Sequence, residues 1–223
     1  TCTFTITVHA QPVADPGAGG NECDLTFVFN ATPSVGLGTW TATGPGTASY
    51  TPSANSPSAT ATVTAYGTYN FTWTEVNGTC SDEDFVGVNF YEQPVVSNQP
   101  NQIQCNTGSF TMTQSAPSIG TGVWTLITGT ATITTPGSPT TTITGVAPGT
   151  SATIRWTVTN GTCTAFDEVT VTNEEQPLVS DQSDQAQCND GNFTMTQSAP
   201  SPGTGVWTLI SGTATITDPG SPS

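Results

Sequence analysis

The chain has 223 residues, a formal net charge of −15, no Lys and a single Arg, Arg155. Nucleic acids and anionic membrane surfaces are bound through Lys and Arg, so this charge argues against both as partners. No transmembrane run is present, which argues against direct membrane insertion of this segment. Only 8% of the residues are charged, and no stretch has the apolar period of a helix, so the composition predicts an all-β protein whose exposed faces are covered by Thr and Ser.

The chain repeats one unit in tandem. Each unit contains a cysteine, two tryptophans and the motif Asn-Gly-Thr-Cys. We expect residues 1–10 to be the last strand of a preceding copy, 11–92 and 93–175 to be two complete copies, and 176–223 to be the first half of a following copy. A chain that starts and stops within a repeat is interpreted as a segment of a longer protein.

The predicted strands are clearest in the second copy, where turn residues separate them. They cover residues 94–96, 109–113, 123–127, 131–134, 140–146, 152–159 and 162–173. Asn160-Gly161 is the strongest hairpin signal, typical of a type I′ turn. About seven strands per unit predict tandem immunoglobulin-like β-sandwich domains arranged as a linear array.

The tryptophans are predicted core residues. Trp124 and Trp156 lie on different strands, and we expect them to face each other across the two sheets. Their counterparts in the other copies are Trp40, Trp73 and Trp207. A glycan-binding platform would need exposed tryptophans, and the apolar alternation around Trp156 argues against it.

The six cysteines predict disulfides. Two pairings repeat in register, Cys23 with Cys80 and Cys105 with Cys163, and Cys2 and Cys188 would then pair with partners in flanking copies. Each bridge would stabilise its domain by roughly 4 kcal/mol in the chain-entropy estimate. A metal site would need closer pairs such as C-x2-C, which are absent. Disulfides imply an oxidising, extracellular location.

Residues suited to catalysis are scarce. His9 is the one histidine, and we interpret it as a surface residue, so no enzyme activity is expected. Acidic residues gather near the joint after the second copy, at Glu174, Glu175, Asp181 and Asp184. Calcium binds six to eight oxygens, so a structural calcium ion at this joint is an alternative to a solvated acidic surface. No other cofactor is expected.

Four motifs carry a resemblance to a known family: Cys-Asn-x-Gly-x-Phe-Thr, Gly-Thr-Gly-Val-Trp-Thr, Pro-Gly-Ser-Pro and Ile-Arg-Trp-Thr-Val-Thr-Asn-Gly-Thr-Cys. They resemble the PKD-like and Ig-like repeats of giant bacterial cell-surface adhesins, the gliding-motility-associated substrates of the type IX secretion system. The resemblance covers essentially the whole chain. It implies an extracellular sandwich array attached to, or released from, the cell surface. Because Cys80 and Cys163 open the last strand, the expected disulfide would staple one pole of each sandwich.

The leading hypothesis is a structural segment of a long extracellular stalk or filament, with each copy acting as a rigid, disulfide-stapled spacer whose partners are further copies along the chain. The alternative is a repeat that itself binds a polysaccharide or a partner cell surface, which predicts a recurring exposed aromatic patch. All four tyrosines, however, belong to the first copy: Tyr50, Tyr66, Tyr69 and Tyr91. A third possibility is a subunit that polymerises by lending strands.

Overall fold

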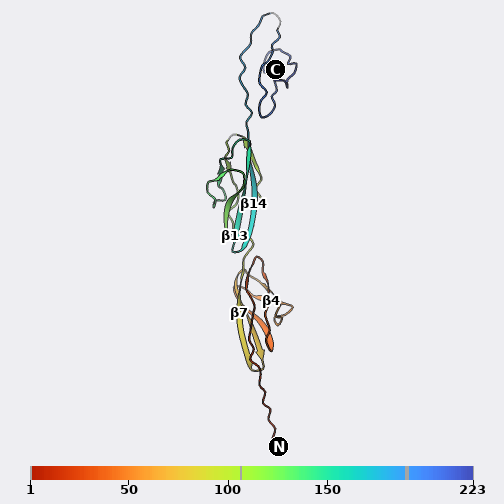
Figure 1. Cartoon of the computed structure of the whole chain (residues 1–223), viewed down its shortest axis with the longest axis vertical. Helices are drawn as coiled ribbons and strands as arrows, with labels where there is room; N and C mark the ends of the chain where they lie inside the picture. The colour runs from red at the N-terminus through yellow and green to blue at the C-terminus, as the bar shows by residue number, and fades with distance from the viewer. Residues whose placement is uncertain (1, 106, 189–190, 223) are drawn as a thin grey trace.

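The computed structural model describes residues 2–105, 107–188 and 191–222. Figure 1 shows a long, narrow molecule in which two β-sandwiches lie end to end, with the two termini at opposite ends. We found no helix among the described residues that is long and apolar enough to cross a membrane.

The first sandwich consists of a four-stranded and a three-stranded sheet. The larger sheet has the order β1-β7-β6-β3, with β1 at Gly20–Glu22, β7 at Cys80–Phe90, β6 at Gly67–Asn77 and β3 at Leu37–Thr43. The smaller sheet has the order β2-β5-β4, with β2 at Thr26–Val28, β5 at Thr60–Val63 and β4 at Ala48–Thr51.

The second sandwich repeats this topology strand for strand. Its larger sheet has the order β10-β13-β14-β8, with β10 at Thr121–Thr128, β13 at Thr150–Asn160, β14 at Cys163–Glu174 and β8 at Gln102–Cys105. Its smaller sheet has the order β11-β12-β9, with β11 at Thr132–Ile133, β12 at Thr142–Thr144 and β9 at Phe110–Thr111. Among the described residues each sandwich therefore has seven strands, and the predicted all-β, immunoglobulin-like architecture is confirmed.

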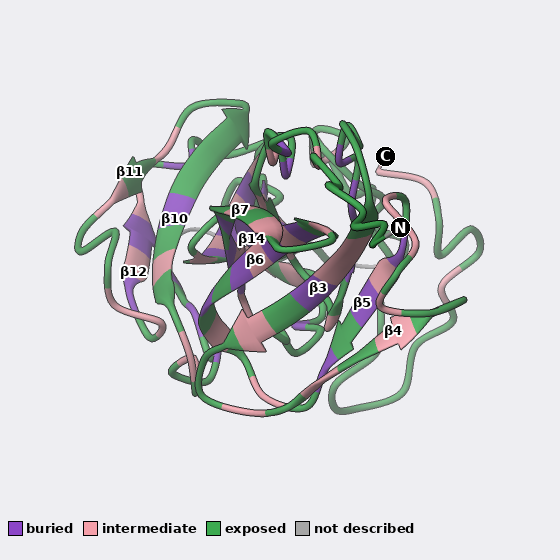
Figure 2. Ribbon diagram, turned by 90° about the horizontal axis from the view of Figure 1, so that it is seen from below, coloured by how far each residue is buried: buried purple, intermediate pink, exposed green. Residues whose placement is uncertain are grey.

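Alternation along the long strands builds each core. In β13, Ile154, Trp156 and Val158 are buried, while the Thr and Arg residues between them are only partly covered. The buried bands on neighbouring strands line up in Figure 2. The same view shows β4 and β5 on one side of the long axis and β11 and β12 on the other, so the smaller sheets of successive sandwiches face opposite sides.

The tryptophans meet within one sheet, and the expectation that they face each other across the sheets is wrong. Trp124 lies directly opposite Trp156 in the β10–β13 ladder, with ring centroids 5.3 Å apart. Trp40 and Trp73 repeat this pairing at 5.0 Å. The reason is that the two strands carrying them are hydrogen-bonded neighbours, so their inward side chains lie side by side.

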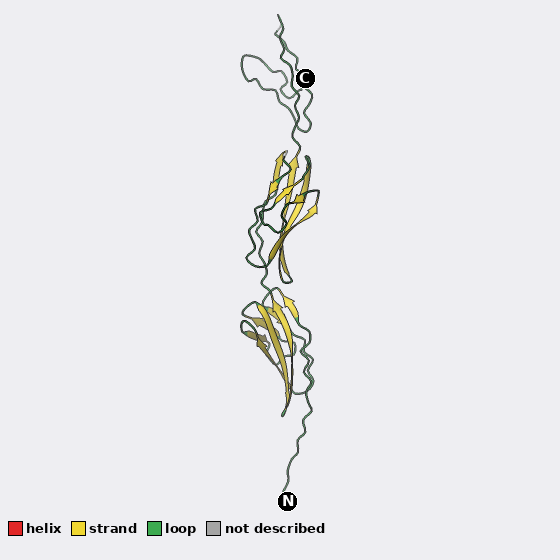
Figure 3. Ribbon diagram, turned by 90° about the vertical axis from the view of Figure 1, so that its left-hand side faces the viewer, coloured by secondary structure: helices red, strands yellow, loops and turns green. Residues whose placement is uncertain are grey.

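The first strand of the second sandwich is displaced from its expected place. Residues 94–96 form no strand, and the strand is β8, which pairs in parallel with the end of β14. Figure 3 shows the long strands of both sandwiches running along the long axis. Because parallel partners share a direction, β8 and β14 end at the same pole of the sandwich.

The described residues between 177 and 222 fold partly like the first half of the second sandwich. They carry an isolated bridge between Leu178 and Ser201, and Figure 3 draws this part as loop. The Trp207 amide donates to the Pro219 carbonyl over 2.8 Å, as the Trp124 amide donates to Pro136. Trp207 is half-buried, whereas the four tryptophans of the two sandwiches are each 1% exposed.

Candidate functional site at the joint between the sandwiches

The two sandwiches meet where the chain leaves β7 and runs toward the hairpin turn of the second sandwich. The Asn160 side-chain amide donates to the Glu92 carbonyl oxygen over 2.8 Å. The Gln93 side-chain amide donates to the Thr164 carbonyl oxygen over 2.7 Å. The segment that links β7 to the second sandwich, the connecting segment, is thus bonded to both sides of the turn between β13 and β14. The second sandwich therefore holds the joint.

The ring of Tyr91 packs on the hairpin turn. Gly161 has a φ of +60°, and a Cβ added to it would lie 2.4 Å from the nearest carbon of the Tyr91 ring. Glycine therefore serves two purposes at this position: it adopts the left-handed conformation that the turn requires, and it leaves room for the aromatic ring.

A disulfide joins the two sandwiches across this contact. Cys23, directly after β1, is bonded to Cys163, the first residue of β14, with their Cα atoms 5.5 Å apart. Cys163 is 1% exposed. The structure leaves Cys2, Cys80, Cys105 and Cys188 as free thiols. The predicted pairings of Cys23 with Cys80 and of Cys105 with Cys163 are therefore wrong.

Strand direction explains this correction. Glu22 lies opposite Phe90 in the parallel β1–β7 ladder, so Cys23 lies at the end of β7 that faces the second sandwich. Cys80 is the first residue of that 11-residue strand, about 36 Å away at ~3.3 Å per residue. A disulfide needs Cα atoms within about 7 Å. The same distance separates Cys105 from Cys163, because Cys105 lies opposite Glu174 at the far end of β14.

The N-terminal segment forms the same joint with the first sandwich. The Asn77 side chain donates to the Ala10 carbonyl over 2.9 Å, and the Gln11 side chain donates to the Ser81 carbonyl over 2.9 Å. The ring of His9 covers Gly78, whose φ is +63°. His9 therefore takes the place of Tyr91. Residue type hides this equivalence in the sequence, because one residue is a histidine and the other a tyrosine. Both nevertheless precede a Gln-Pro pair by two positions.

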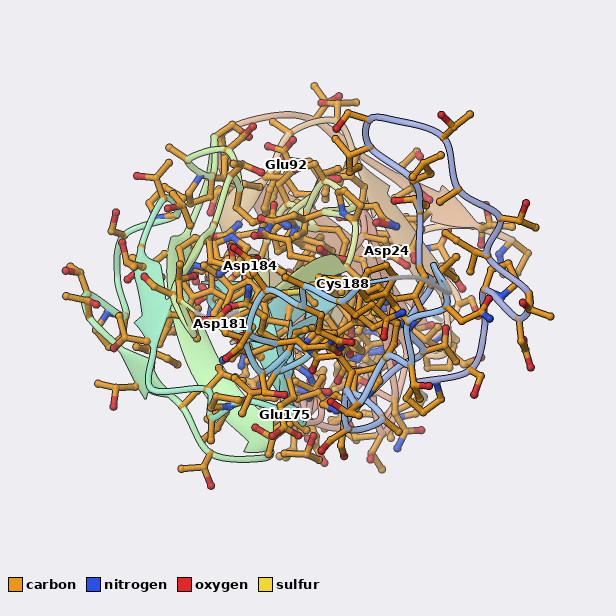
Figure 4. All side chains as sticks on the ribbon, turned by 90° about the horizontal axis from the view of Figure 1, so that it is seen from above. Asp24, Glu92, Glu175, Asp181, Asp184 and Cys188 are labelled. Atoms are coloured by element: carbon orange, nitrogen blue, oxygen red, sulfur yellow. A yellow bond between two sulfur atoms is a disulfide. The ribbon has the colours of Figure 1, made fainter. Side chains whose placement is uncertain are left out.

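The acidic residues near the C-terminal joint are not gathered into one cluster. Asp181 and Asp184 line one shallow hollow, and Glu174 and Glu175 line another. Figure 4, which looks down the long axis, labels Glu175, Asp181 and Asp184. Over the part of the chain that the structure describes, no three His, Cys, Asp or Glu side chains are placed to hold a metal ion together.

Glu75 is a carboxylate in the core of the first sandwich, and it is 1% exposed. Its carboxylate accepts hydrogen bonds from the Trp73 indole over 3.0 Å and from the Ser34 amide over 3.0 Å. Burial alone would raise its pKa, but the hydrogen bonds from Ser34 and Trp73 outweigh burial and hold the pKa below its ordinary value. No repeated pattern predicted this group, because the second copy has Val158 two positions after Trp156, where the first copy has Glu75 after Trp73.

The tyrosines do not form one exposed patch. Tyr69 is buried, and Tyr91 lies at the joint. Burial raises the pKa of Tyr50 to about 12, and its hydroxyl has no hydrogen-bond partner among the described residues. Tyr66, at 40% exposure, is the one tyrosine among the exposed large apolar side chains of the described chain.

Comparison with known proteins gives structural matches only. No family model matches the chain, and no curated protein matches it. Among solved structures, it is similar to extracellular domains 3–5 of Drosophila OTK, with 14% identity, a TM-score of 0.48, and coverage of 73% of this chain and 61% of that one. It is also similar to titin domains I67–I69, with 14% identity, a TM-score of 0.41, and coverage of 78% and 68%. Immunoglobulin domains 1–5 of Sidekick-1 match with 11% identity, a TM-score of 0.45, and coverage of 78% and 40%.

Proposed function

We propose that this chain is a structural segment of a long extracellular stalk or filament of a bacterial surface adhesin. Each copy acts as a rigid spacer, and the partners of each copy are the neighbouring copies along the chain. We place the copies at residues 1–10, 11–92, 93–175 and 176–223, with the first and last being parts of copies. The bacterial surface origin rests on the resemblance of the repeat motifs to gliding-motility-associated adhesins of the type IX secretion system.

The joint is the observation that carries this proposal. Between β7 and the second sandwich, the connecting segment is tied by two side-chain hydrogen bonds, covered by the Tyr91 ring and bridged by the Cys23–Cys163 bond. A flexible linker would have none of these contacts. The joint contacts are repeated before the first sandwich, as a periodic spacer requires.

The composition supports the same function. A net charge of −15 makes neighbouring chains repel each other. The Thr-rich outer faces of the sheets are hydrated through their hydroxyl groups and offer no charged binding site. A structural disulfide persists in oxidising compartments outside the cytosol.

Intact producing cells should therefore bind an antibody raised against the second copy, and label confined to permeabilised cells would contradict the surface location.

Electron microscopy of the purified chain tests the spacer role. We expect a straight rod with an axial rise of roughly 40 Å per copy, because an 11-residue strand spans about 36 Å, and a narrow distribution of the angle between the two sandwiches. The matched control is Cys163→Ser, which removes the bond and leaves the hydrogen bonds in place, and it should broaden the angle distribution. A broad distribution in the oxidised wild-type chain would contradict a rigid spacer.

A further inference from the structure

Two of the free cysteines occupy the same places in the repeat as the two that are bonded. Cys105 ends β8 and lies opposite Glu174 at the C-terminal pole of the second sandwich. Cys23 occupies the same pole of the first sandwich, because it directly follows Glu22, which lies opposite Phe90. Cys80 is the first residue of β7, as Cys163 is the first of β14. Each sandwich therefore presents one cysteine at each pole.

The contacts of Cys80 match those of Cys163. The Cys163 sulfur lies 3.9 Å from the Tyr91 carbonyl oxygen, and the Cys80 sulfur lies 3.8 Å from the His9 carbonyl oxygen. In the complete joint, the Tyr91 amide donates to the Glu22 carbonyl over 2.8 Å, which places Cys23 next to Cys163. Residues 9–11 thus reproduce around Cys80 one of the two sides that surround the bonded Cys163. The other side is the one that Cys23 provides.

We propose that Cys80 and Cys105 each form a further disulfide between neighbouring copies. Cys80 bonds the cysteine that aligns with Cys23 in the preceding copy, and Cys105 bonds the cysteine that aligns with Cys163 in the following copy. Cys2 and Cys188 follow the same rule. The inference rests on the proposed function, because it needs copies on both sides.

The chemistry is a thiol–disulfide exchange with a disulfide oxidant of the dithiol oxidoreductase class. The thiolate of one joint cysteine attacks the oxidant's disulfide, and the second joint thiolate then displaces the oxidant's sulfur and forms the inter-copy bond. The two joint thiols lose two protons and two electrons, and the oxidant is reduced to a dithiol. Cys105 is exposed and Cys80 is partly exposed, so both can be reached.

The proposed bonds create two continuous covalent paths along the array, here called tracks, each made of backbone segments joined by disulfides. One track runs through the backbone from Cys80 to Cys105, and the other runs from Cys163 to Cys188, shifted by one copy. Both segments are 25 positions long. Within the second sandwich the tracks are neighbouring parallel strands, β8 and β14.

These segments have little slack. A fully extended stretch of 25 residues spans about 83–90 Å, and two copies of roughly 40 Å each occupy nearly the same length. The strand at each end of the first segment, β7 and β8, is already extended. Tension would therefore pass along the two tracks, and the rest of each sandwich would carry none of it.

Disulfide mapping of the full-length protein tests this proposal. The protein is collected from its source in an alkylating agent, which caps free thiols, and is digested with pepsin. Trypsin has a single site here, at Arg155, and the acidity that pepsin needs keeps thiols protonated and suppresses exchange. The peptide around Cys105, Gln-Ile-Gln-Cys-Asn-Thr, differs from Gln-Ala-Gln-Cys-Asn-Asp around Cys188, so the two nearly identical copies are distinguishable.

We expect the Cys105 peptide to be linked to a peptide containing Asn-Gly-Thr-Cys from another copy of the same chain. An alkylated Cys105, a bond from Cys105 to Cys163, or a non-reducing gel in which Cys105 links separate chains would each overturn the proposal. The control is the Cys23–Cys163 peptide pair, which should be found in every case. If Cys105 is alkylated while electron microscopy still shows straight rods, this inference fails and the spacer function stands.

Discussion

At the scale of single residues, Glu75 is a buried carboxylate of the first sandwich whose ionisation is coupled to folding. It accepts hydrogen bonds from the Trp73 indole and the Ser34 amide inside the core, and its pKa is held below the ordinary value. Stability from a carboxylate with a lowered pKa is fully present above the unfolded-state pKa, about 4.3 for Glu. It is lost as the pH falls through the folded-state pKa.

Glu75→Gln should therefore destabilise the first sandwich by about 1–3 kcal/mol at pH 7, the cost of weakening hydrogen bonds to buried donors. The difference from wild type should begin to shrink below about pH 4.3, where the Glu75 carboxylate of the unfolded chain takes up a proton. It should disappear once the pH has fallen through the lower folded-state pKa. Urea unfolding monitored by tryptophan fluorescence measures both quantities. Glu83→Gln, at an exposed position of β7, is the control. A difference that stays constant from pH 7 to pH 3 would contradict the assigned role of Glu75.

At the scale of elements, the hairpin between β13 and β14 positions the joint. Its Asn-Gly pair sets a tight turn, and the Asn160 side chain binds the connecting segment. Gly161 has no side chain and so leaves room for the Tyr91 ring. Cys163 follows at the start of β14. One turn thus aligns a hydrogen bond, an aromatic contact and the disulfide.

Gly161→Ala should displace the Tyr91 ring and strain the backbone, since an added Cβ would lie 2.4 Å from the ring at a φ of +60°. We expect a cost of about 1–2 kcal/mol for an L-residue in the left-handed region and a lower yield of the Cys23–Cys163 bond on oxidative refolding. The yield is measured by peptide mapping. Gly137→Ala is the control, because nothing lies within 4 Å of its added Cβ. Equal yields in the two variants would contradict the role given to the turn.

The elements that could be predicted from the sequence are those whose pattern reflects burial. Strand β13 alternates cleanly between buried and partly covered residues, and Asn160-Gly161 specifies its turn, so both were evident. Strand β8 was missed because its sequence, Gln-Ile-Gln-Cys, has no apolar face and Ile103 is 67% exposed. It is held by backbone pairing to β14, which leaves no trace in hydrophobic periodicity.

The wrong disulfide pairing follows from that missed strand. With the first strand placed at residues 94–96, nothing assigned Cys105 to either end of the sandwich. The regular repeat of the cysteine spacing then favoured a bond within each copy. The parallel pairing of β8 with β14 places Cys105 far from Cys163, just as β1 places Cys23 far from Cys80. Tandem repetition alone does not tell bonds within a copy from bonds between copies, since both repeat with the same period.

At the scale of the whole molecule, the Cys23–Cys163 bond determines which residues can carry tension. A force applied to the two ends of the chain passes from Cys23 through the disulfide to Cys163. Residues 24–162, which include most strands of both sandwiches, then lie outside the load path. The bond spans 140 positions in the sequence, so the shielded contour is about 500 Å at ~3.6 Å per residue.

Single-molecule stretching of this chain between its ends, with and without reductant, tests the central claim that a covalent bond between the sandwiches makes the joint rigid. We predict that the reduced chain releases about 500 Å more contour than the oxidised chain, and that Cys23→Ser behaves like the reduced chain under both conditions. Bonds within each copy would shield two shorter loops and leave the joint between them in the load path. Equal contour release by the oxidised and reduced chains would contradict the Cys23–Cys163 bond and the rigid spacer built on it.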